Sequence, residues 1–142
     1  MTEPTNTAVD LFSVFATDEA AEENGIETTL PMCGETLFTV ARSNSPAYLK
    51  LVQKLAAQNK AILASDTPAS KAKNKELMAR VFAETILLGW QGTINYKGEA
   101  LTYSKENAKL LLSHPEFLAK VREVSDDYKT FLVVKDAEDE KN

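Results

Sequence analysis

The stretch Leu87–Leu112 reads LLGWQGTINYKGEALTYSKENAKLLL and organises the interpretation of the whole chain. Gly89 follows an apolar run, and glycine ends helices readily, so the pattern predicts a long helix that stops there. Trp90, the only tryptophan, comes next, and two later glycines enclose a short polar excursion. Ser104 is a favourable N-cap for a further helix. The stretch therefore predicts a junction between two parts of the fold and carries no catalytic motif.

Length and composition are typical of one folded domain. The chain has 142 residues, 44% of them hydrophobic and 26% charged, and a chain of this size buries roughly 70% of the surface of its unfolded form. No apolar run approaches the roughly 20 residues that span a bilayer, and the first ten residues lack the features of a signal peptide. Cys33 is the only cysteine, so no internal disulfide can form. We expect a cytoplasmic protein.

The charges are distributed unevenly around a net charge of −5. Residues 1–27 carry seven acids and no Lys or Arg, whereas residues 42–80 carry eight bases and two acids. One interpretation is ordinary solvated helix faces. The other is a basic patch that complements an acidic arm or an acidic partner. Nucleic-acid binding is not expected, because the isoelectric point is about 5.0 and no aromatic residues lie between the lysines.

Short strands are predicted in the first third of the chain. Ile26–Met32 and Thr36–Arg42 have the composition of two strands, with Cys33-Gly34-Glu35 as the turn between them. Leu11–Phe15 can supply a third strand, which would help because an isolated hairpin is marginally stable. The sequence therefore predicts a small N-terminal β-hairpin or three-stranded sheet.

Helix starts are marked by a capping residue followed by proline. Ser45-Pro46 predicts a helix to about residue 62, and Thr67-Pro68 predicts a second helix to about Leu88. The first half of this second helix is basic and alanine-rich, so we expect it to be exposed. Ser104 begins a short helix through Leu112, and His114-Pro115 begins the last helix. The predicted fold class is α+β, mainly α, with the sheet packed on about four helices. We expect a flexible lead over residues 1–9, a single domain over 10–134 and a charged flexible tail over 135–142.

No set of residues suited to catalysis or metal binding stands out in the sequence. His114 is the only histidine and lies at a helix start, and Cys33 has no basic neighbours that would lower its pKa. A metal site needs three or four convergent ligands. A small hydrolase or transferase that uses Glu84, His114 or Cys33 is therefore the weakest alternative. We predict no catalytic, cofactor-binding or metal-binding residues.

Aromatic and apolar residues are the candidates for binding a partner protein. Trp90 allows two interpretations, a packing hinge at the helix exit or an exposed anchor, since Trp and Tyr are enriched in binding hot spots; we favour the hinge. A heptad-like stripe runs along the last helix from Phe117 to Phe131, where we expect the helix to end, and it either packs on the core or forms a self-association surface. The candidate partner-binding residues are Trp90, Tyr103, Phe117, Val121, Tyr128 and Phe131.

Several sequence features follow one another in a characteristic order from about residue 10 to residue 132. It starts with Asp10-Leu11-Phe12, continues through the predicted strand pair ending at Arg42, and passes the cap Asn44-Ser45-Pro46. Its most specific parts are Leu87–Gly92 and Gly98–Asn107. In this order of features the chain resembles the tail assembly chaperones of long-tailed bacteriophages.

The resemblance implies a binding protein without catalytic chemistry. Such chaperones coat the tape-measure protein before the tail tube polymerises around it, and they recruit tail tube subunits. The resemblance thus implies host cytoplasm during infection, absence from the mature virion, and neither a nucleic-acid nor a membrane partner. Coating a long helical client favours an apolar groove flanked by charge and weak homo-oligomeric contacts. The alternative is a minor structural protein of the virion, a tail or head-completion component.

Overall fold

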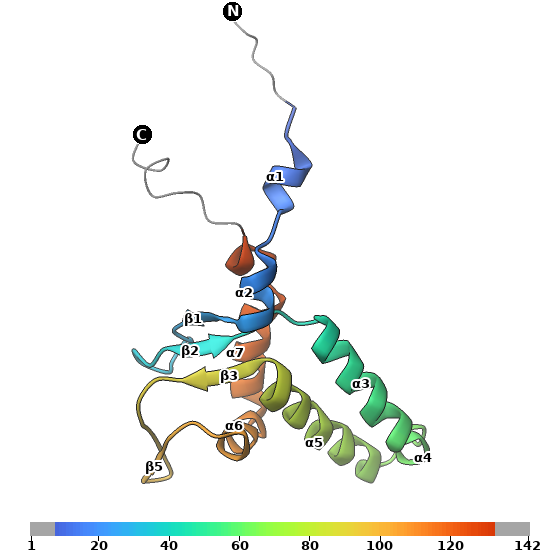
Figure 1. Cartoon of the computed structure of the whole chain (residues 1–142). Helices are drawn as coiled ribbons and strands as arrows, with labels where there is room; N and C mark the ends of the chain where they lie inside the picture. Colours follow the sequence, from blue (N-terminus) through green and yellow to red (C-terminus); the bar gives the residue numbers. More distant parts are fainter. Residues whose placement is uncertain (1–7, 133–142) are drawn as a thin grey trace, which may run out of the picture.

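The structure, a computed structural model, describes residues 8–132 and consists of helices packed around a small antiparallel sheet (Figure 1). The elements are α1 (Leu11–Phe15), α2 (Glu19–Asn24), β1 (Ile26–Thr28), β2 (Phe38–Val40), α3 (Pro46–Gln58), α4 (Lys60–Leu63), α5 (Pro68–Thr85), β3 (Leu87–Trp90), β4 (Ile94–Tyr96), β5 (Glu99–Leu101), α6 (Lys105–Leu112), α7 (Pro115–Asp126) and the 3-10 helix η1 (Tyr128–Phe131). The predicted α+β, mainly α class is confirmed. Most of the predicted lead and all of the predicted tail lie outside the described residues.

The main sheet has the strand order β1-β2-β3, and all neighbours are antiparallel. Phe38 of the central strand β2 lies opposite Trp90 of β3. A separate hairpin joins β4 to β5 through Lys97 and Gly98, whose φ angles are 51° and 80°. Two consecutive positive φ angles are typical of the tight turn that suits the right-handed twist of a hairpin. The polar excursion between Gly92 and Gly98 forms β4 and the turn of this hairpin.

The predicted helix that ends at Gly89 is wrong. Helix α5 ends at Thr85, and the chain enters β3 at Leu87. Gly89 lies inside that strand opposite Thr39 and does not terminate a helix. A short apolar run without periodicity suits a buried strand as well as a buried helix. Pairing with β2 decides between them, because it satisfies the backbone of β3 while Leu87 and Trp90 are buried.

The predicted third strand at Leu11–Phe15 is also wrong, since these residues form α1 and β3 supplies the third strand. Asp10 starts α1 because its carboxylate accepts hydrogen bonds from the Phe12 N–H at 3.1 Å and the Ser13 hydroxyl at 2.8 Å. The predicted hairpin is confirmed as β1 and β2. Its strands are shorter than predicted, and residues 29–37 form a longer connection.

The predicted helix caps are confirmed. The hydroxyls of Ser45, Thr67 and Ser104 each accept a backbone N–H three residues further on, at 3.3, 3.1 and 3.0 Å. The first long helix breaks at Asn59 into α3 and α4.

The predicted last helix is too long. Helix α7 ends at Asp126, because Asp127 has an extended backbone and its carboxylate caps η1 by accepting from the Lys129 N–H at 3.0 Å. Tyr128 and Phe131 therefore belong to η1 and do not continue the apolar stripe of α7.

Two apolar clusters hold the described residues together. The larger joins the main sheet to α5, α6 and α7 and includes Phe38, Phe82 and Val121. The smaller joins α3 and α4 to α5 through Leu55 and Val81. Figure 1 shows α3, α4 and α5 as a helical hairpin extending from the sheet, and it shows α1 projecting beyond α2 at the other end of the molecule.

Candidate functional site

Trp90 lies in the core and is 7% exposed. Its ring packs against Phe38 at 6.1 Å and against Tyr103 at 5.2 Å between ring centroids. Its indole N–H donates to the backbone carbonyl of Leu101 at 3.4 Å, which ties the β4–β5 hairpin to the main sheet. This position agrees with the packing interpretation of Trp90. Burial raises the pKa of the neighbouring Tyr103 hydroxyl.

The other predicted partner-binding residues lie in different places and form no common surface. Val121 and Phe131 are buried in the core, with 0% and 1% exposure. Phe117 is half-buried against Phe38, with ring centroids 5.8 Å apart. Tyr128 packs against Phe15 of α1 at 5.3 Å. In this structure, most of the apolar area of these residues is used inside the molecule.

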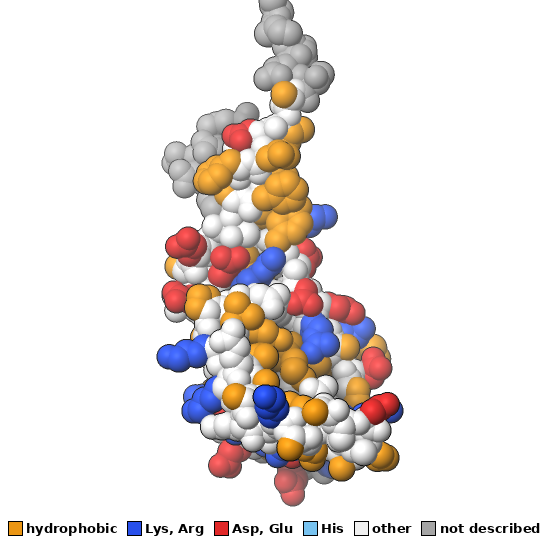
Figure 2. All heavy atoms as spheres, turned by 90° about the vertical axis from the view of Figure 1, so that its right-hand side faces the viewer, with side chains coloured by type: hydrophobic (Ala, Val, Ile, Leu, Met, Phe, Trp, Pro, Cys, Tyr) orange, Lys and Arg blue, Asp and Glu red, His pale blue; other side chains and the backbone are white. Residues whose placement is uncertain are grey.

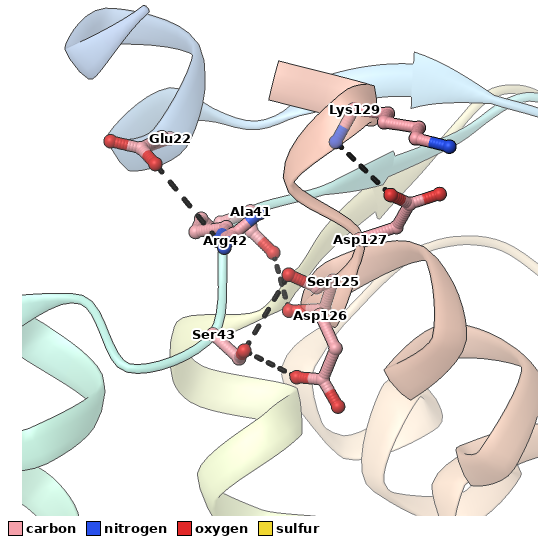
Figure 3. A network of polar contacts seen from close by, with 8 residues as sticks. All are labelled: Glu22, Ala41, Arg42, Ser43, Ser125, Asp126, Asp127 and Lys129. Atoms are coloured by element: carbon pink, nitrogen blue, oxygen red, sulfur yellow. Dashed lines mark hydrogen bonds and ion pairs between the residues drawn. The ribbon is translucent and has the colours of Figure 1, made fainter. Parts of the chain in front are cut away.

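A polar network joins the end of β2 to the end of α7 (Figure 3). The Ser125 hydroxyl, which is fully buried, donates to the carbonyl of Ala41 at 2.8 Å. The Ser43 N–H donates to the Ser125 carbonyl at 3.2 Å, and the Ser43 hydroxyl donates to the Asp126 carboxylate. A serine nucleophile needs an adjacent base and an accessible hydroxyl. Here the buried serines fix α7 against the sheet instead.

The residues of the enzyme alternative lie on separate elements. The ring of His114 packs against Tyr96 at 5.4 Å and shares a hydrogen bond with its hydroxyl. Glu84 accepts from Arg80 at 2.8 Å on α5. Cys33 lies in the connection between β1 and β2, and burial raises its pKa. No two of His114, Glu84 and Cys33 line the same one of four hollows on residues 8–132.

Two further properties concern the described residues only. Within residues 8–132, no three His, Cys, Asp or Glu side chains come together in a way that could hold a metal ion. None of the helices in that range combines the length and apolar character needed to cross a membrane.

Two adjacent grooves run along α5, and the Lys75 side chain borders both. The α5–α6 groove has a volume of about 650 Å³ and is mostly apolar, with Ala72, Ala79 and Leu110 in its lining. Its rim carries two bases and two acids, Lys75, Lys109, Glu76 and Glu106. Leu110 is one of the few large apolar residues on the described surface and is 42% exposed.

The α5–α7 groove has a volume of about 690 Å³. Met78, Leu118 and Ala119 contribute apolar surface to it. Its charged lining residues are Lys71, Lys75, Arg122, Glu123 and Asp126. These are three bases and two acids, so the lining carries one net positive charge. The alanine-rich, basic first half of α5 was the sequence signal for both grooves.

The largest exposed apolar surface lies on the segment Val9–Phe15, which contains α1. Its exposed side chains are Val9, Leu11, Phe12, Val14 and Phe15. Figure 2 shows hydrophobic side chains gathered on this projecting part of the molecule. Phe12 is the most exposed of them, at 81%. A patch of this kind marks an interaction surface more often than an ordinary monomer surface.

The structure thus has an apolar projection and two apolar grooves flanked by charge, which are features of a protein that binds other proteins. The family model of the YdaY prophage protein matches residues 43–142. The match spans most of the chain, and the chain belongs to the YdaY prophage protein family. The predicted bacteriophage context is therefore confirmed. Neither a curated protein nor a solved structure matches significantly. The matched residues include both grooves but not α1.

Proposed function

We propose that this protein is a tail assembly chaperone that binds the phage tape-measure protein, and also tail tube subunits, without catalysing a reaction. The observation that carries the proposal is the α5–α6 groove, an apolar trough with charged edges that lies within the family match. The phage origin of the family and the resemblance in the order of sequence features support the same function.

The α5–α6 groove suits an amphipathic helix. Ala72 and Ala79 have small side chains, so the backbone of a client helix can approach α5 closely. Leu110 rises beside them as an apolar anchor. Helix-in-groove recognition uses apolar residues spaced by three or four positions on the client. The groove therefore fits the long helical segments expected of a tape-measure protein.

The charges at the rim favour weak and repeated binding. Lys75 and Glu76 face the groove from α5, and Glu106 and Lys109 face it from α6. Solvent-exposed charge pairs contribute roughly 0–1 kcal/mol each, so they orient a client more than they hold it. A chaperone that coats a long chain and is later displaced by the tail tube needs this property.

Co-expression with the tape-measure protein of the same prophage tests the proposal. The wild-type chain should raise the soluble fraction of that protein, and Leu110→Asp should abolish the increase by placing a charge in the groove. Leu49→Asp is the matched control, because Leu49 is a helical leucine of nearly equal exposure, 44% against 42%, and does not line the groove. Equal tape-measure solubility with and without the wild-type chain would refute the proposal.

The fate of the protein distinguishes the alternative role. A chaperone acts in the host cytoplasm and should be absent from purified phage particles. Mass spectrometry of particles induced from the prophage measures this directly. A stoichiometric amount of the chain in the particles would instead favour a minor structural protein of the virion.

A further inference from the structure

We propose that α1 binds the α5–α7 groove of a second copy of this chain, in a head-to-tail contact. We call the segment Val9–Phe15 the arm. This contact does not rest on the proposed function, since it needs no client protein.

The arm is structured but largely uncovered. The residues that follow the arm are fixed to the rest of the molecule. The Asp18 N–H donates to the Phe131 carbonyl at 2.7 Å, and Thr17 forms a β-bridge with Leu132. Phe15 leans on Tyr128 with ring centroids 5.3 Å apart. Beyond these contacts, the large side chains of Leu11 and Phe12 are mostly exposed to solvent. A helix of five residues is too short to be stable alone, so a binding surface that covers it would stabilise it.

The arm projects away from its own body. Figure 1 shows α1 beyond α2 and η1, whereas α5 lies toward the opposite end of the molecule. The exposed apolar side chains of the arm are therefore presented to another molecule. Phe15 follows Phe12 by three residues and Leu11 by four, the spacing that lets a helix insert anchors into a groove.

Charge complementarity selects the α5–α7 groove as the receiving surface. Asp10 lies within the arm and Asp18-Glu19 follow it, and residues 8–27 contain no Lys or Arg. The lining of the α5–α7 groove carries three bases against the two acids Glu123 and Asp126, an excess of one positive charge. The rim of the α5–α6 groove balances two bases with two acids and so offers an acidic segment no comparable attraction. Opposite charges at the edges steer and orient such a contact around its apolar centre.

The contact is heterologous, because the arm and the groove are different surfaces. A copy that donates its arm keeps its own groove free for the arm of a third copy. Such contacts form a ring when the rotation between copies closes and an open chain when it does not. The α5–α6 groove remains available in each copy, since its apolar lining residues Ala79 and Leu110 do not line the α5–α7 groove.

Sedimentation velocity of the full chain over a range of protein concentrations at low salt tests the contact. We expect the average sedimentation coefficient of the wild type to rise with concentration. Phe12→Ser should weaken self-association at least about tenfold, as for loss of a central apolar anchor. Met32→Ser is the matched control, because Met32 is an apolar residue with 98% exposure that lies outside the arm, and this variant should associate like the wild type.

The groove is tested by the double variant Lys71→Glu with Ala119→Glu, which places acids where the acidic arm would bind. Circular dichroism checks its folding, and Lys71→Glu alone is the milder substitute. The arm variant and the groove variant should each be monomeric. Their equimolar mixture should form a dimer that does not extend, because each retains one competent surface.

Three results would overturn the proposal. The first is a wild type that remains monomeric at every concentration, which would mean that the arm packs on its own chain. The groove variant would associate like the wild type if arms bind arms. Met32→Ser would weaken association as much as Phe12→Ser if the effect is unspecific apolar contact. A monomeric wild type that still solubilises the tape-measure protein would refute this contact alone and leave the chaperone function standing.

Discussion

Replacement of Trp90 by alanine should strongly destabilise the fold, because this side chain joins three parts of it. It pairs with Phe38 across the sheet, packs on Tyr103 before α6 and donates a hydrogen bond to Leu101 of β5. Removing a buried aromatic side chain costs about 3–5 kcal/mol. Loss of the indole hydrogen bond is part of that cost, at about 1 kcal/mol. We therefore expect Trp90→Ala to lower the free energy of unfolding by about 4 kcal/mol.

The smaller replacement Trp90→Phe separates the two contributions. It keeps a ring between Phe38 and Tyr103 but removes the indole N–H that reaches Leu101. We expect a loss of about 1–2 kcal/mol, from the hydrogen bond and a small change in volume. Phe12→Ala is the control for an aromatic residue outside the core. It should change the free energy of unfolding by no more than about 0.5 kcal/mol, because Phe12 is 81% exposed.

Urea unfolding followed by circular dichroism is the suitable assay. Trp90 is the only tryptophan of the chain, so intrinsic tryptophan fluorescence is lost in both variants. A loss of about 4 kcal/mol corresponds to a fall in melting temperature of roughly 10–20 °C for a chain of this size. A loss below about 1 kcal/mol for Trp90→Ala would refute the packing role. An unchanged melting temperature with lost partner binding would make Trp90 an anchor.

Two further predictions follow from buried polar groups. Ser125→Ala should lower the free energy of unfolding by about 1–3 kcal/mol in urea titrations, because the carbonyl of Ala41 loses the buried hydroxyl that it accepts from; an unchanged midpoint would mean that another donor replaces it. Cys33 should react with a thiol reagent more slowly in the folded than in the urea-unfolded chain at equal pH, because burial raises its pKa and lowers its thiolate fraction. Since the unfolded thiol ionises first as pH rises, this group lowers stability above its unfolded pKa, and equal rates in both states would contradict the burial.

Local chemistry made the helix starts predictable from the sequence. Ser45, Thr67 and Ser104 cap helices through bonds that span three residues, so their neighbours in the sequence contain the whole signal. The same locality identifies α1 in retrospect, since Asp10 and Ser13 have the residue types and spacing of a helix start. The apolar, β-prone composition of Leu11–Phe15 led to the prediction of a strand instead.

Contacts between distant parts of the chain were not predictable in the same way. Leu87–Trp90 becomes a strand because β2, far earlier in the sequence, provides its partner. The apolar face of a helix can be predicted from its periodicity, but the element that covers this face cannot. Val121 and Phe131 were candidate binding residues by type, yet the fold buries both. The grooves along α5 depend on the packing of α6 and α7, and the sequence indicated only the exposed, basic character of α5.

The central strand β2 has a consequence for how this protein family is delimited. The family match begins at Ser43, so it includes β3 but excludes β1 and β2. A fragment that starts at Ser43 would leave β3 without its hydrogen-bonding neighbour and would uncover the side of Trp90 that faces Phe38. An apolar strand edge of this kind is a template for aggregation. In this chain, the matched residues alone therefore lack the strands β1 and β2 that complete the sheet around Trp90.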